Sequence, residues 1–255
     1  INLNNTDVMF GGELEEIDAK FFTNIQGMYP YTSNVNKERT SKGVFVNTNT
    51  VMLNSTVVSS GIRYDTVDGF GDRTTGRIGI SKNGASASVS TGYRIPTLYE
   101  MYGQDNYGFT GNPNLQEEST TSYEVGYKTN YSDTAVFVTK ENDAIIYNGT
   151  YVNDDDTSYT KGIENKIFFE LDGFFIANSV SYIEAKQSNG NEKLRRPKLT
   201  NNLKVSKLVN DIVYSVDADY YGKHKDISST TFQTIDVGSI ITYNTNTCRS
   251  KDATS

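Results

Sequence analysis

The 255-residue sequence has almost none of the residues that build metal centres and disulfide frameworks. Its one cysteine, Cys248, excludes an internal disulfide, and its one histidine, His224, leaves no pair of soft ligands for a structural zinc site. Tryptophan is absent and there are only 4 prolines, whereas there are 18 tyrosines and 12 phenylalanines. Together with abundant Asn, Thr and Ser, this composition favours strands joined by polar turns over packed helices.

Positive charge and long apolar runs are also scarce. The 24 Lys and Arg residues are outnumbered by 31 Asp and Glu residues, which gives a net charge of −7. We therefore expect no nucleic-acid partner, because phosphate binding needs clustered positive charge. No run of about 18 apolar residues could form a membrane-spanning helix. A membrane-spanning strand needs only about 9–11 residues with one apolar face, so this absence does not exclude a membrane.

Catalytic and metal-binding patterns are missing too. A Ser-His-Asp unit would have to use His224, which lies in a polar segment, and there is no G-x-S-x-G element. No glycine-rich phosphate-binding motif follows a predicted strand. The run Asp154-Asp155-Asp156 lacks the flanking ligands of a calcium loop and is more typical of a solvated loop. We expect no enzyme, no bound metal and no cofactor.

What the sequence does contain is an alternation of apolar and polar residues. It is clearest in residues 85–95, 123–131, 199–209 and 211–222, where every second residue is mostly apolar or aromatic. A period of two predicts strands with one apolar and one polar face. With less regular segments included, about twelve strands are predicted, each close to the length that crosses a bilayer when tilted.

The predicted links between these strands alternate in length. Tight turns are expected near Asn54-Ser55, Asn83-Gly84, Ser132-Asp133, Asp172-Gly173 and Asn210-Asp211. Longer links are expected over residues 21–41, 68–73, 96–119, 148–158, 187–197 and 223–231. Such alternation places all short links at one rim and all long loops at the other, as in outer-membrane barrels.

A soluble β-sandwich would also alternate the two faces of its strands, so the pattern leaves two fold classes open. The predicted strands are long for a sandwich, in which a typical strand has about 5–6 residues. Tyrosine also recurs near the strand ends, where the aromatic girdle of a membrane barrel lies. The pattern favours the membrane barrel.

Three motifs resemble signatures of TonB-dependent outer-membrane receptors. Residues 92–102, GYRIPTLYEMY, resemble G-F-R-A-P-S-L-x-E-L-Y, and residues 111–118 and 122–127 then resemble G-N-P-N-L-x-P-E and S-Y-E-x-G. The matching positions are Gly92, Arg94, Pro96, Leu98, Gly111, Asn112, Pro113, Leu115, Glu118, Tyr123, Glu124 and Gly126. One position departs from the pattern, because Glu117 stands where the family usually has proline.

Two shorter segments add to this resemblance. Residues 61–65, GIRYD, with Phe70-Gly71, resemble the G-x-R-Y-D strand that usually precedes these motifs. Residues 194–197, LRRP, resemble the family's later R-R-P-x strand entrance and are reminiscent of its cobalamin-receptor branch.

The resemblance implies an all-β fold, an antiparallel transmembrane β-barrel. Residues 1–243 would supply about twelve of its strands, against about 22 in a complete transporter, and so an incomplete barrel. No part of the sequence resembles the family's plug domain or energy-coupling box. Residues 244–255 do not alternate and contain Cys248, and we interpret them as an irregular tail that arises from truncation.

The resemblance also suggests where a ligand would bind. It places the loop of residues 96–119 outside the cell, with four aromatic rings available to stack on a large, partly planar ligand. These candidate ligand-binding residues are Tyr99, Tyr102, Tyr107 and Phe109. The alternative is that the rings pack the loop onto the barrel rim without touching a ligand.

Three arginines fall on polar strand faces and are expected to point into the barrel lumen: Arg63, Arg77 and Arg94. They could contact a plug or an anionic ligand. The favoured interpretation is that neighbouring carboxylates, such as Asp65 and Glu124, pair with them.

As a function, the resemblance implies energised import of a large, scarce nutrient across a bacterial outer membrane. Cobalamin is the first ligand choice because of residues 194–197, with ferric siderophores or haem next. The implied partners are outer-membrane lipid, the nutrient, and TonB acting through a plug domain that is absent from this chain. Two alternatives stay open: a secreted, soluble β-sandwich that binds or adheres, and an outer-membrane porin or adhesin without energy coupling.

Overall fold

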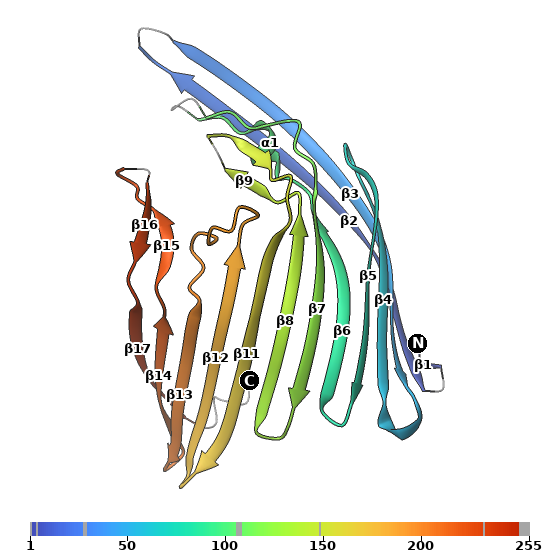
Figure 1. Cartoon of the computed structure of the whole chain (residues 1–255), viewed down its shortest axis with the longest axis vertical. Helices are drawn as coiled ribbons and strands as arrows, with labels where there is room; N and C mark the ends of the chain where they lie inside the picture. Colours follow the sequence, from blue (N-terminus) through green and yellow to red (C-terminus); the bar gives the residue numbers. More distant parts are fainter. Residues whose placement is uncertain are drawn as a thin grey trace. The chain divides into compact units, whose positions relative to one another are not determined.

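The computed structural model describes residues 2–3, 5–27, 30–105, 109–147, 149–231 and 233–249, and strands dominate them (Figure 1). The elements are β1 (Asn2–Leu3), β2 (Thr6–Ile25), β3 (Tyr31–Val51), η1 (Leu53–Ser55), β4 (Val57–Val67), β5 (Gly71–Lys82), β6 (Ala85–Arg94), α1 (Leu98–Tyr102), β7 (Glu118–Lys128), β8 (Ser132–Asn142), β9 (Ile145–Tyr147), β10 (Tyr151–Asn153), β11 (Ser158–Leu171), β12 (Phe174–Lys186), β13 (Leu199–Val209), β14 (Ile212–Tyr221), β15 (His224–Ile227), β16 (Thr234–Val237) and β17 (Ile240–Arg249). Within these described ranges no helix is long and apolar enough to cross a membrane.

Thirteen of the described strands belong to one sheet, in the order β1-β2-β3-β4-β5-β6-β7-β8-β11-β12-β13-β14-β17. The hairpins β9–β10 and β15–β16 form two separate two-stranded sheets. The registered pairs are antiparallel. The predicted all-β, antiparallel fold is therefore confirmed.

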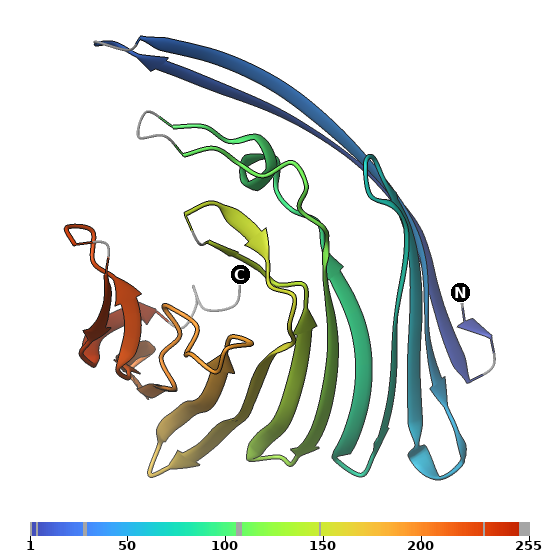
Figure 2. The same cartoon turned by 45° about the horizontal axis from the view of Figure 1, so that its top comes forward.

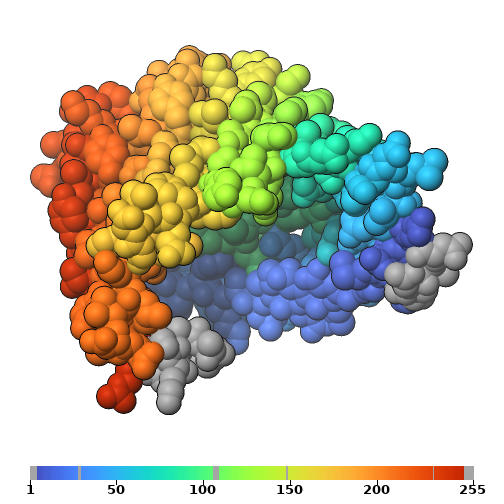
Figure 3. Space-filling view, turned by 90° about the horizontal axis from the view of Figure 1, so that it is seen from below, coloured from blue at the N-terminus to red at the C-terminus, as the bar shows by residue number. Residues whose placement is uncertain are grey.

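Tight turns join several neighbouring strands where the sequence predicts them. Asn83-Gly84, Asp172-Gly173 and Asn210-Asp211 link β5 to β6, β11 to β12 and β13 to β14, and all six residues have φ between 49° and 86°. Two successive residues with positive φ make a type I′ turn, whose twist matches that of the strands it joins. Figure 3 shows the molecule from below the view of Figure 1, from the side of the strand ends that carry these turns.

The expected long link over residues 21–41 is wrong. Strand β2 continues to Ile25 and β3 begins at Tyr31, and the two are paired from Thr6↔Thr50 to Ile25↔Tyr31. This hairpin extends far beyond the ends of β4 and β5 (Figure 2). We call its outer part, residues 17–25 and 31–39, the arm. Along β2 within the arm, every second residue from Ile17 to Ile25 is less exposed than its neighbours, as in a strand, and Thr23 has only 2% of its surface exposed.

The chain divides into two compact units, which are described separately below. Unit 1 consists of Ile1–Asn83, Ser88–Tyr123 and Lys140–Ser158. Unit 2 consists of Gly84–Ala87, Glu124–Thr139 and Tyr159–Ser255.

The apolar face of the sheet in unit 1 is exposed. Register places Phe10 opposite Val46 and Val46 opposite Ile62, and their exposed fractions are 66%, 37% and 53%. The buried apolar residues lie instead at the loop end of the strands: Val67, Leu98, Met101, Leu115 and Ala144. A β-sandwich would bury the apolar face of its sheet. In the wall of a membrane barrel, by contrast, the apolar face of the sheet is exposed to lipid and the opposite, polar face is exposed to water.

The expected irregular tail is wrong for residues 244–249. They form the second half of β17, which pairs with β14 from Tyr221↔Ile240 to Ile212↔Arg249. Cys248 lies in this strand opposite Val213 and is exposed. Residues 250–255 lie outside the described part of the chain.

Candidate functional site

The loop between β6 and β7 is built around a capped helix, α1. The Thr97 hydroxyl accepts a hydrogen bond from Glu100 N at 3.1 Å, and the Glu100 carboxylate accepts one from Thr97 N at 2.7 Å. This reciprocal capping box satisfies backbone donors at the start of the helix. Leu98 and Met101 are buried. The motif at residues 92–102 therefore encodes a fixed helical turn.

Arg94, the last residue of β6, joins α1 to β7 and β9. Its Nε and Nη2 atoms donate to the two carboxylate oxygens of Glu118 at 2.6 and 2.7 Å, and Nη1 donates to Glu100 at 3.0 Å. Glu118 is 6% exposed and also accepts from Ile145 N at 2.6 Å. Burial favours a raised pKa for Glu100, but hydrogen bonds from Arg94 and Thr97 outweigh it, so the pKa lies below its usual value of 4.5.

The chain after α1 folds back closely across the helix. Asn112 N donates to Glu100 O at 2.9 Å, and the Asn112 side-chain amide donates to Tyr151 O of β10 at 3.0 Å. A Cβ atom on Gly111 would lie 2.6 Å from the Met101 carbonyl carbon. Glycine is therefore required at position 111 because no side chain fits between the two backbones.

The β9–β10 hairpin is tied to the same loop by an amide. The Asn153 side chain donates to Gln116 O at 2.9 Å and to Asp143 O at 2.8 Å, and accepts from Gln116 N at 2.8 Å. Glu117, which stands where the family usually has proline, forms an ion pair with Arg73 of β5. This ion pair restrains the loop at the position where the proline is missing.

Five aromatic rings connect the arm, the β6–β7 loop and the β9–β10 hairpin. Ring centroids are 5.9 Å apart for Phe21 and Tyr99, 5.3 Å for Tyr99 and Phe109, 5.7 Å for Phe109 and Tyr151, and 5.4 Å for Tyr147 and Tyr151. We call these five residues the aromatic cluster. Edge-to-face and stacked pairs at these distances are attractive. The cluster therefore couples three segments that are distant in sequence.

Two cationic side chains also attach the arm to this loop. Arg39 donates from Nη1 to Pro96 O at 2.5 Å. The Lys37 ammonium lies 4.4 Å from the centroid of the Tyr102 ring, in a cation–π contact. The arm is thus held at Phe21, Lys37 and Arg39.

The predicted ligand-binding residues are only partly brought together. Tyr99 and Phe109 stack on one another within the aromatic cluster, whereas Tyr102 lies under Lys37. Tyr107 lies outside the described residues. Their contact with a ligand stays a prediction. Sequence reasoning missed three members of the cluster: Phe21, Tyr147 and Tyr151. Phe21 and Tyr151 belong to segments that are expected to be links, and Tyr147 is expected only as a residue near a strand end.

The polar face of unit 1 carries a second charged group. Arg63 donates from Nε to Asp65 at 2.8 Å, and its Nη2 atom lies 2.9 Å from a carboxylate oxygen of Glu13. Asp65 is only 2% exposed. A Cβ atom on Gly43 would collide with the Asp65 carboxylate, so glycine makes room for the pair. Pairing of Arg63 with Asp65 agrees with the favoured interpretation of this arginine.

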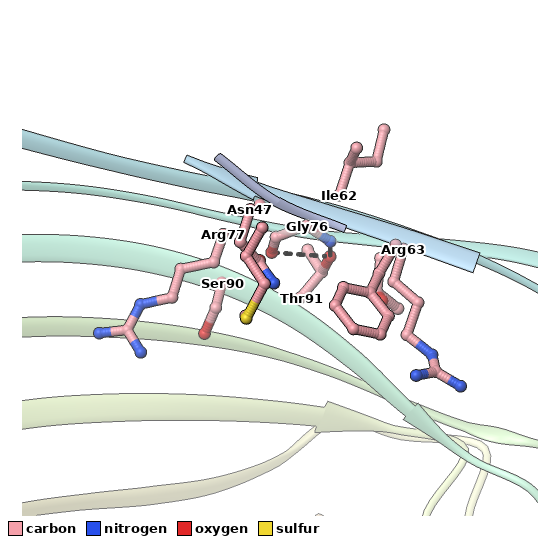
Figure 4. A pocket seen from close by; sticks show the side chains of 11 residues that line it. Asn47, Ile62, Arg63, Gly76, Arg77, Ser90 and Thr91 are labelled. Atoms are coloured by element: carbon pink, nitrogen blue, oxygen red, sulfur yellow. Dashed lines mark hydrogen bonds between the residues drawn. The ribbon is translucent and has the colours of Figure 1, made fainter. Parts of the chain in front are cut away.

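Beside Arg63 the same face has a shallow hollow of about 420 Å³ (Figure 4). Arg63, Arg77 and Ser90 point to one side of the sheet and Ile62 points to the other. Within the described residues Arg77 has no ion pair or hydrogen-bond partner. Glu124, the other carboxylate named for the arginines, is exposed.

The remaining motif residues keep strands close or stay exposed. A Cβ atom on Gly92 would lie 2.9 Å from the Thr120 hydroxyl in unit 1. One on Gly126 would lie 2.8 Å from the Ser86 hydroxyl in unit 2. Tyr123, by contrast, is 49% exposed on its strand. Pro113 follows Asn112 in the turn that leads to the buried Leu115.

In unit 2, the residues of the LRRP segment contact the β15–β16 hairpin. Arg195 has φ of 59°, its backbone N donates to Lys225 O at 2.7 Å, and its Nε donates to Asp226 at 2.7 Å. The Arg195 guanidinium lowers the pKa of the Asp226 carboxyl below its usual value. This segment therefore anchors one loop of unit 2 to another.

A metal site is not evident in the part of the chain that the structure describes, where no three His, Cys, Asp or Glu side chains are placed to hold an ion. Asp154 is hydrogen-bonded through its backbone N to Ala144 O at 2.8 Å. This backbone hydrogen bond holds the first residue of the Asp154–Asp156 run against the start of the β9–β10 segment.

Comparison with protein families gives one match over nearly the whole chain: the family described as TonB dependent receptor-like, beta-barrel, matches residues 1–250. Two curated relatives are each named Vitamin B12 transporter BtuB. The one from Vibrio cholerae serotype O1 is 27% identical over 190 residues, and the one from Photobacterium profundum is 26% identical over 191 residues. The matched regions are 70% and 67% of this chain but 30% of each relative.

Solved structures with the same fold cover almost all of this chain. The ferric enterobactin receptor PfeA has a TM-score of 0.74 at 16% identity, covering 96% of this chain and 44% of that one. The ferric yersiniabactin uptake receptor FyuA from Yersinia pestis has a TM-score of 0.66 at 15% identity, and the copper transporter OprC 0.71 at 12%. The chain thus spans less than half the length of the proteins it matches.

Proposed function

Because the chain belongs to the TonB-dependent receptor β-barrel family, we propose that it supplies part of the barrel wall of an outer-membrane receptor that imports a large, scarce nutrient. The observation that carries this proposal is the family match over residues 1–250. The apolar strand face would contact outer-membrane lipid, and the polar face with Arg63 and Arg77 would line the lumen. Energy would come from TonB acting through a plug domain elsewhere in the receptor.

Loops at one end of unit 1 would take part in capturing the nutrient. The aromatic cluster supports this role because rigid rings can stack on a large ligand with partly planar groups. Tyr99 is 45% exposed, so its ring is accessible even though it packs on Phe109 and Phe21. The barrel itself would be a passive scaffold for these loops.

Cobalamin is the ligand we propose first. Two curated relatives are named as vitamin B12 transporters, and the LRRP segment at residues 194–197 resembles that branch of the family. Ferric siderophores come next, since the solved ferric enterobactin and ferric yersiniabactin receptors share the fold.

The test is uptake by the complete receptor. The complete gene would be expressed in a bacterial strain that lacks its own cobalamin receptor, and accumulation of labelled cobalamin would be measured with and without TonB. We expect TonB-dependent accumulation, and a ferric siderophore serves as the competing nutrient. Accumulation that does not need TonB would identify a passive porin, and failure to bind or accumulate either nutrient would reject the proposed receptor role.

A further inference from the structure

The two segments that carry Tyr99, Phe109, Tyr147 and Tyr151 of the aromatic cluster contain carboxylates but no basic side chain. Residues 96–119 have four Asp or Glu residues and residues 141–158 have five, and neither segment contains Lys, Arg or His. Figure 1 shows both segments, marked by α1 and β9, at the end of unit 1 where the arm lies. The rings therefore lie among negative charges.

The basic side chains that contact these segments from elsewhere in unit 1 are already engaged. Their partners among the described residues are as follows: Arg94 with Glu118 and Glu100, Arg73 with Glu117, Lys37 with the Tyr102 ring, and Arg39 with Pro96 O. Lys20 is the remaining basic residue of the arm, and it lies on the opposite face of β2 from Phe21. A negatively charged ligand at the rings would thus meet carboxylates without a cation that is free to pair with it.

Some of the carboxylates lie directly beside the rings. Asp105 accepts a hydrogen bond from Phe109 N at 2.9 Å, which fixes its charge next to that residue. Glu100 follows Tyr99 in α1. Burial raises the pKa of the Tyr151 phenol, and the Glu100 carboxylate raises it further. The direction of this second effect is that of a negative electrostatic potential at the Tyr151 ring.

Three further carboxylates border the β9–β10 hairpin and are exposed: Asp143, Asp155 and Asp156. Within the described residues none of the three has an ion pair. Asp155 is four residues from Tyr151, and Asp143 is four residues from Tyr147, so no more than about 14 Å of chain separates either charge from a ring. Charges act over this distance at 0.01 M ionic strength, where the Debye length is about 30 Å.

We propose that the aromatic cluster selects its nutrient by charge: it takes a neutral or positively charged molecule with a planar face and excludes negatively charged iron chelates such as ferric catecholates. The inference rests on the proposed role of the cluster in capturing the nutrient. Stacking on the rings attracts a neutral planar group, and a cationic group gains further from the faces of the rings. Each negative charge on a ligand is instead repelled by the carboxylates around the rings.

The first experiment measures the potential at the cluster without any nutrient. Tyr147→Cys is placed in the complete receptor, in a background without other reactive cysteines that includes Cys248→Ser. In detergent and with a chelator present, the thiol is reacted with two methanethiosulfonates of similar size, one carrying trimethylammonium and one carrying sulfonate. The ratio of the two rates reports the local potential, because the intrinsic reactivity of the thiol cancels.

At 0.01 M ionic strength we expect this ratio to favour the cationic reagent at least about tenfold more than it does for a small free thiol. Tyr131→Cys is the matched control, because Tyr131 is similarly exposed, 67% against 58% for Tyr147, but lies beside the Ser132-Asp133 turn. Its ratio should equal that of the free thiol. An equal ratio at both positions would reject the proposal.

The second experiment identifies the source of the potential. In Asp143→Asn/Asp155→Asn/Asp156→Asn, which changes only exposed side chains, we expect the rate ratio at Tyr147→Cys to fall at least about fivefold. The variant Glu170→Gln/Asp172→Asn/Asp211→Asn removes the same charge from exposed positions at tight turns, and it should leave the ratio unchanged. Equal effects of the two triple variants would overturn the assignment of the potential to these loops.

The third experiment measures the selection itself. Binding to the complete receptor is compared for two derivatives of cyanocobalamin in which one peripheral amide is converted either to a carboxylate or to a neutral N-methylamide. At 0.01 M ionic strength we expect the carboxylate to bind at least about fivefold more weakly, and the difference to shrink in 1 M salt, where the Debye length is about 3 Å. It should also shrink in Asp143→Asn/Asp155→Asn/Asp156→Asn.

Equal affinity for the two derivatives, or tight binding of a ferric catecholate, would overturn the proposed charge selection. If the receptor binds neither a corrinoid nor an iron chelate, the proposed receptor function is rejected instead. The rate ratio at Tyr147→Cys does not depend on any nutrient, so it still decides the sign of the potential in that case.

Discussion

Arg94 and Glu118 form a two-pronged ion pair at the entrance of the β6–β7 loop, with donor–acceptor distances of 2.6 and 2.7 Å. The Arg94 side chain is 42% exposed, whereas that of Glu118 is 8% exposed. The geometry is that of a guanidinium matched to a planar carboxylate, which lysine cannot reproduce. The pair is thus a fixed part of the loop and not a surface contact.

The first prediction concerns this pair. Arg94→Met leaves the buried Glu118 carboxylate with only Ile145 N as a described donor, and a buried acceptor that loses its partner costs about 1–3 kcal/mol. We expect faster hydrogen exchange in residues 97–103 and 145–147, measured on the complete receptor by mass spectrometry. Arg77→Met is the matched control, because Arg77 has no ion pair within the described residues. Equal effects of the two substitutions would contradict the role given to Arg94.

The second prediction is a pH dependence of the same loop. The pKa of Glu100 lies below its usual value of 4.5, because hydrogen bonds from Arg94 and Thr97 to its carboxylate outweigh burial. A depressed pKa means that the folded loop favours the charged form, so this stabilisation is complete above pH 4.5. It is lost as the pH falls from 4.5 through the lower folded-state pKa.

Local hydrogen exchange of residues 97–103 between pH 6 and pH 3, corrected for intrinsic rates, measures this effect. In Glu100→Gln the side chain can still accept from Thr97 N, but it no longer titrates. We therefore expect the variant loop to be less protected at pH 6 and to change less on acidification. If hydrogen exchange of the loop changes equally with pH in the wild type and in Glu100→Gln, a group other than Glu100 causes the pH dependence.

Much of the sheet could be predicted because its turns and strand faces depend on residues that are close together in the sequence. Asn-Gly and Asp-Gly pairs favour the two positive φ values of a hairpin turn, and the structure has them at Asn83-Gly84 and Asp172-Gly173. The alternation of apolar and polar residues then sets which face each strand shows.

The arm and the end of β17 could not be predicted in this way. Residues 21–41 lack a sustained apolar face, and residues 244–249 lack alternation, yet both are strands. Each is held by backbone hydrogen bonds to a neighbouring strand, β3 to β2 and β17 to β14. Backbone pairing is independent of side-chain type, so a polar sequence gives little indication of it.

The candidate site was predictable as a motif but not as a cluster. Arg94 and Glu118 belong to separate motifs, and their spacing gives no sign that they bind each other. Phe21 and Tyr151 reach Tyr99 and Phe109 only because the arm, the β6–β7 loop and the β9–β10 hairpin meet at the end of the sheet.

The third prediction tests the close approach at Gly111. A Cβ atom there would lie 2.6 Å from backbone atoms of α1, which cannot move without breaking the helix. We expect Gly111→Ala to destabilise the loop by about 1–3 kcal/mol, as overpacking does, and to increase proteolysis between residues 97 and 117. Gly238→Ala is the control, because no heavy atom lies within 4 Å of the added Cβ. Resistance of Gly111→Ala to protease at the wild-type level would show that the backbone can adjust.

The last prediction separates packing from ligand binding at Tyr99. This ring stacks on Phe109 and meets the edge of Phe21, and each such pair contributes about 0.5–1.5 kcal/mol. Tyr99→Ala should therefore loosen the arm, seen as faster trypsin cleavage at Lys37 and Arg39. Tyr123→Ala removes a similarly exposed ring from a strand face and should leave the arm unchanged.

Nutrient affinity then distinguishes the two roles of the ring. If Tyr99 only packs the loop, Tyr99→Phe keeps both ring contacts, and cleavage of the arm and affinity for cobalamin both stay at wild-type levels. If the Tyr99 hydroxyl also forms a hydrogen bond with the ligand, Tyr99→Phe lowers the affinity for the ligand while the arm stays protected from trypsin. A net hydrogen bond of about 0.5–1.5 kcal/mol corresponds to a loss of affinity of roughly two- to tenfold. Protection of the arm and affinity, measured on the same variants, thus show whether the Tyr99 hydroxyl takes part in ligand recognition in addition to the packing of the ring.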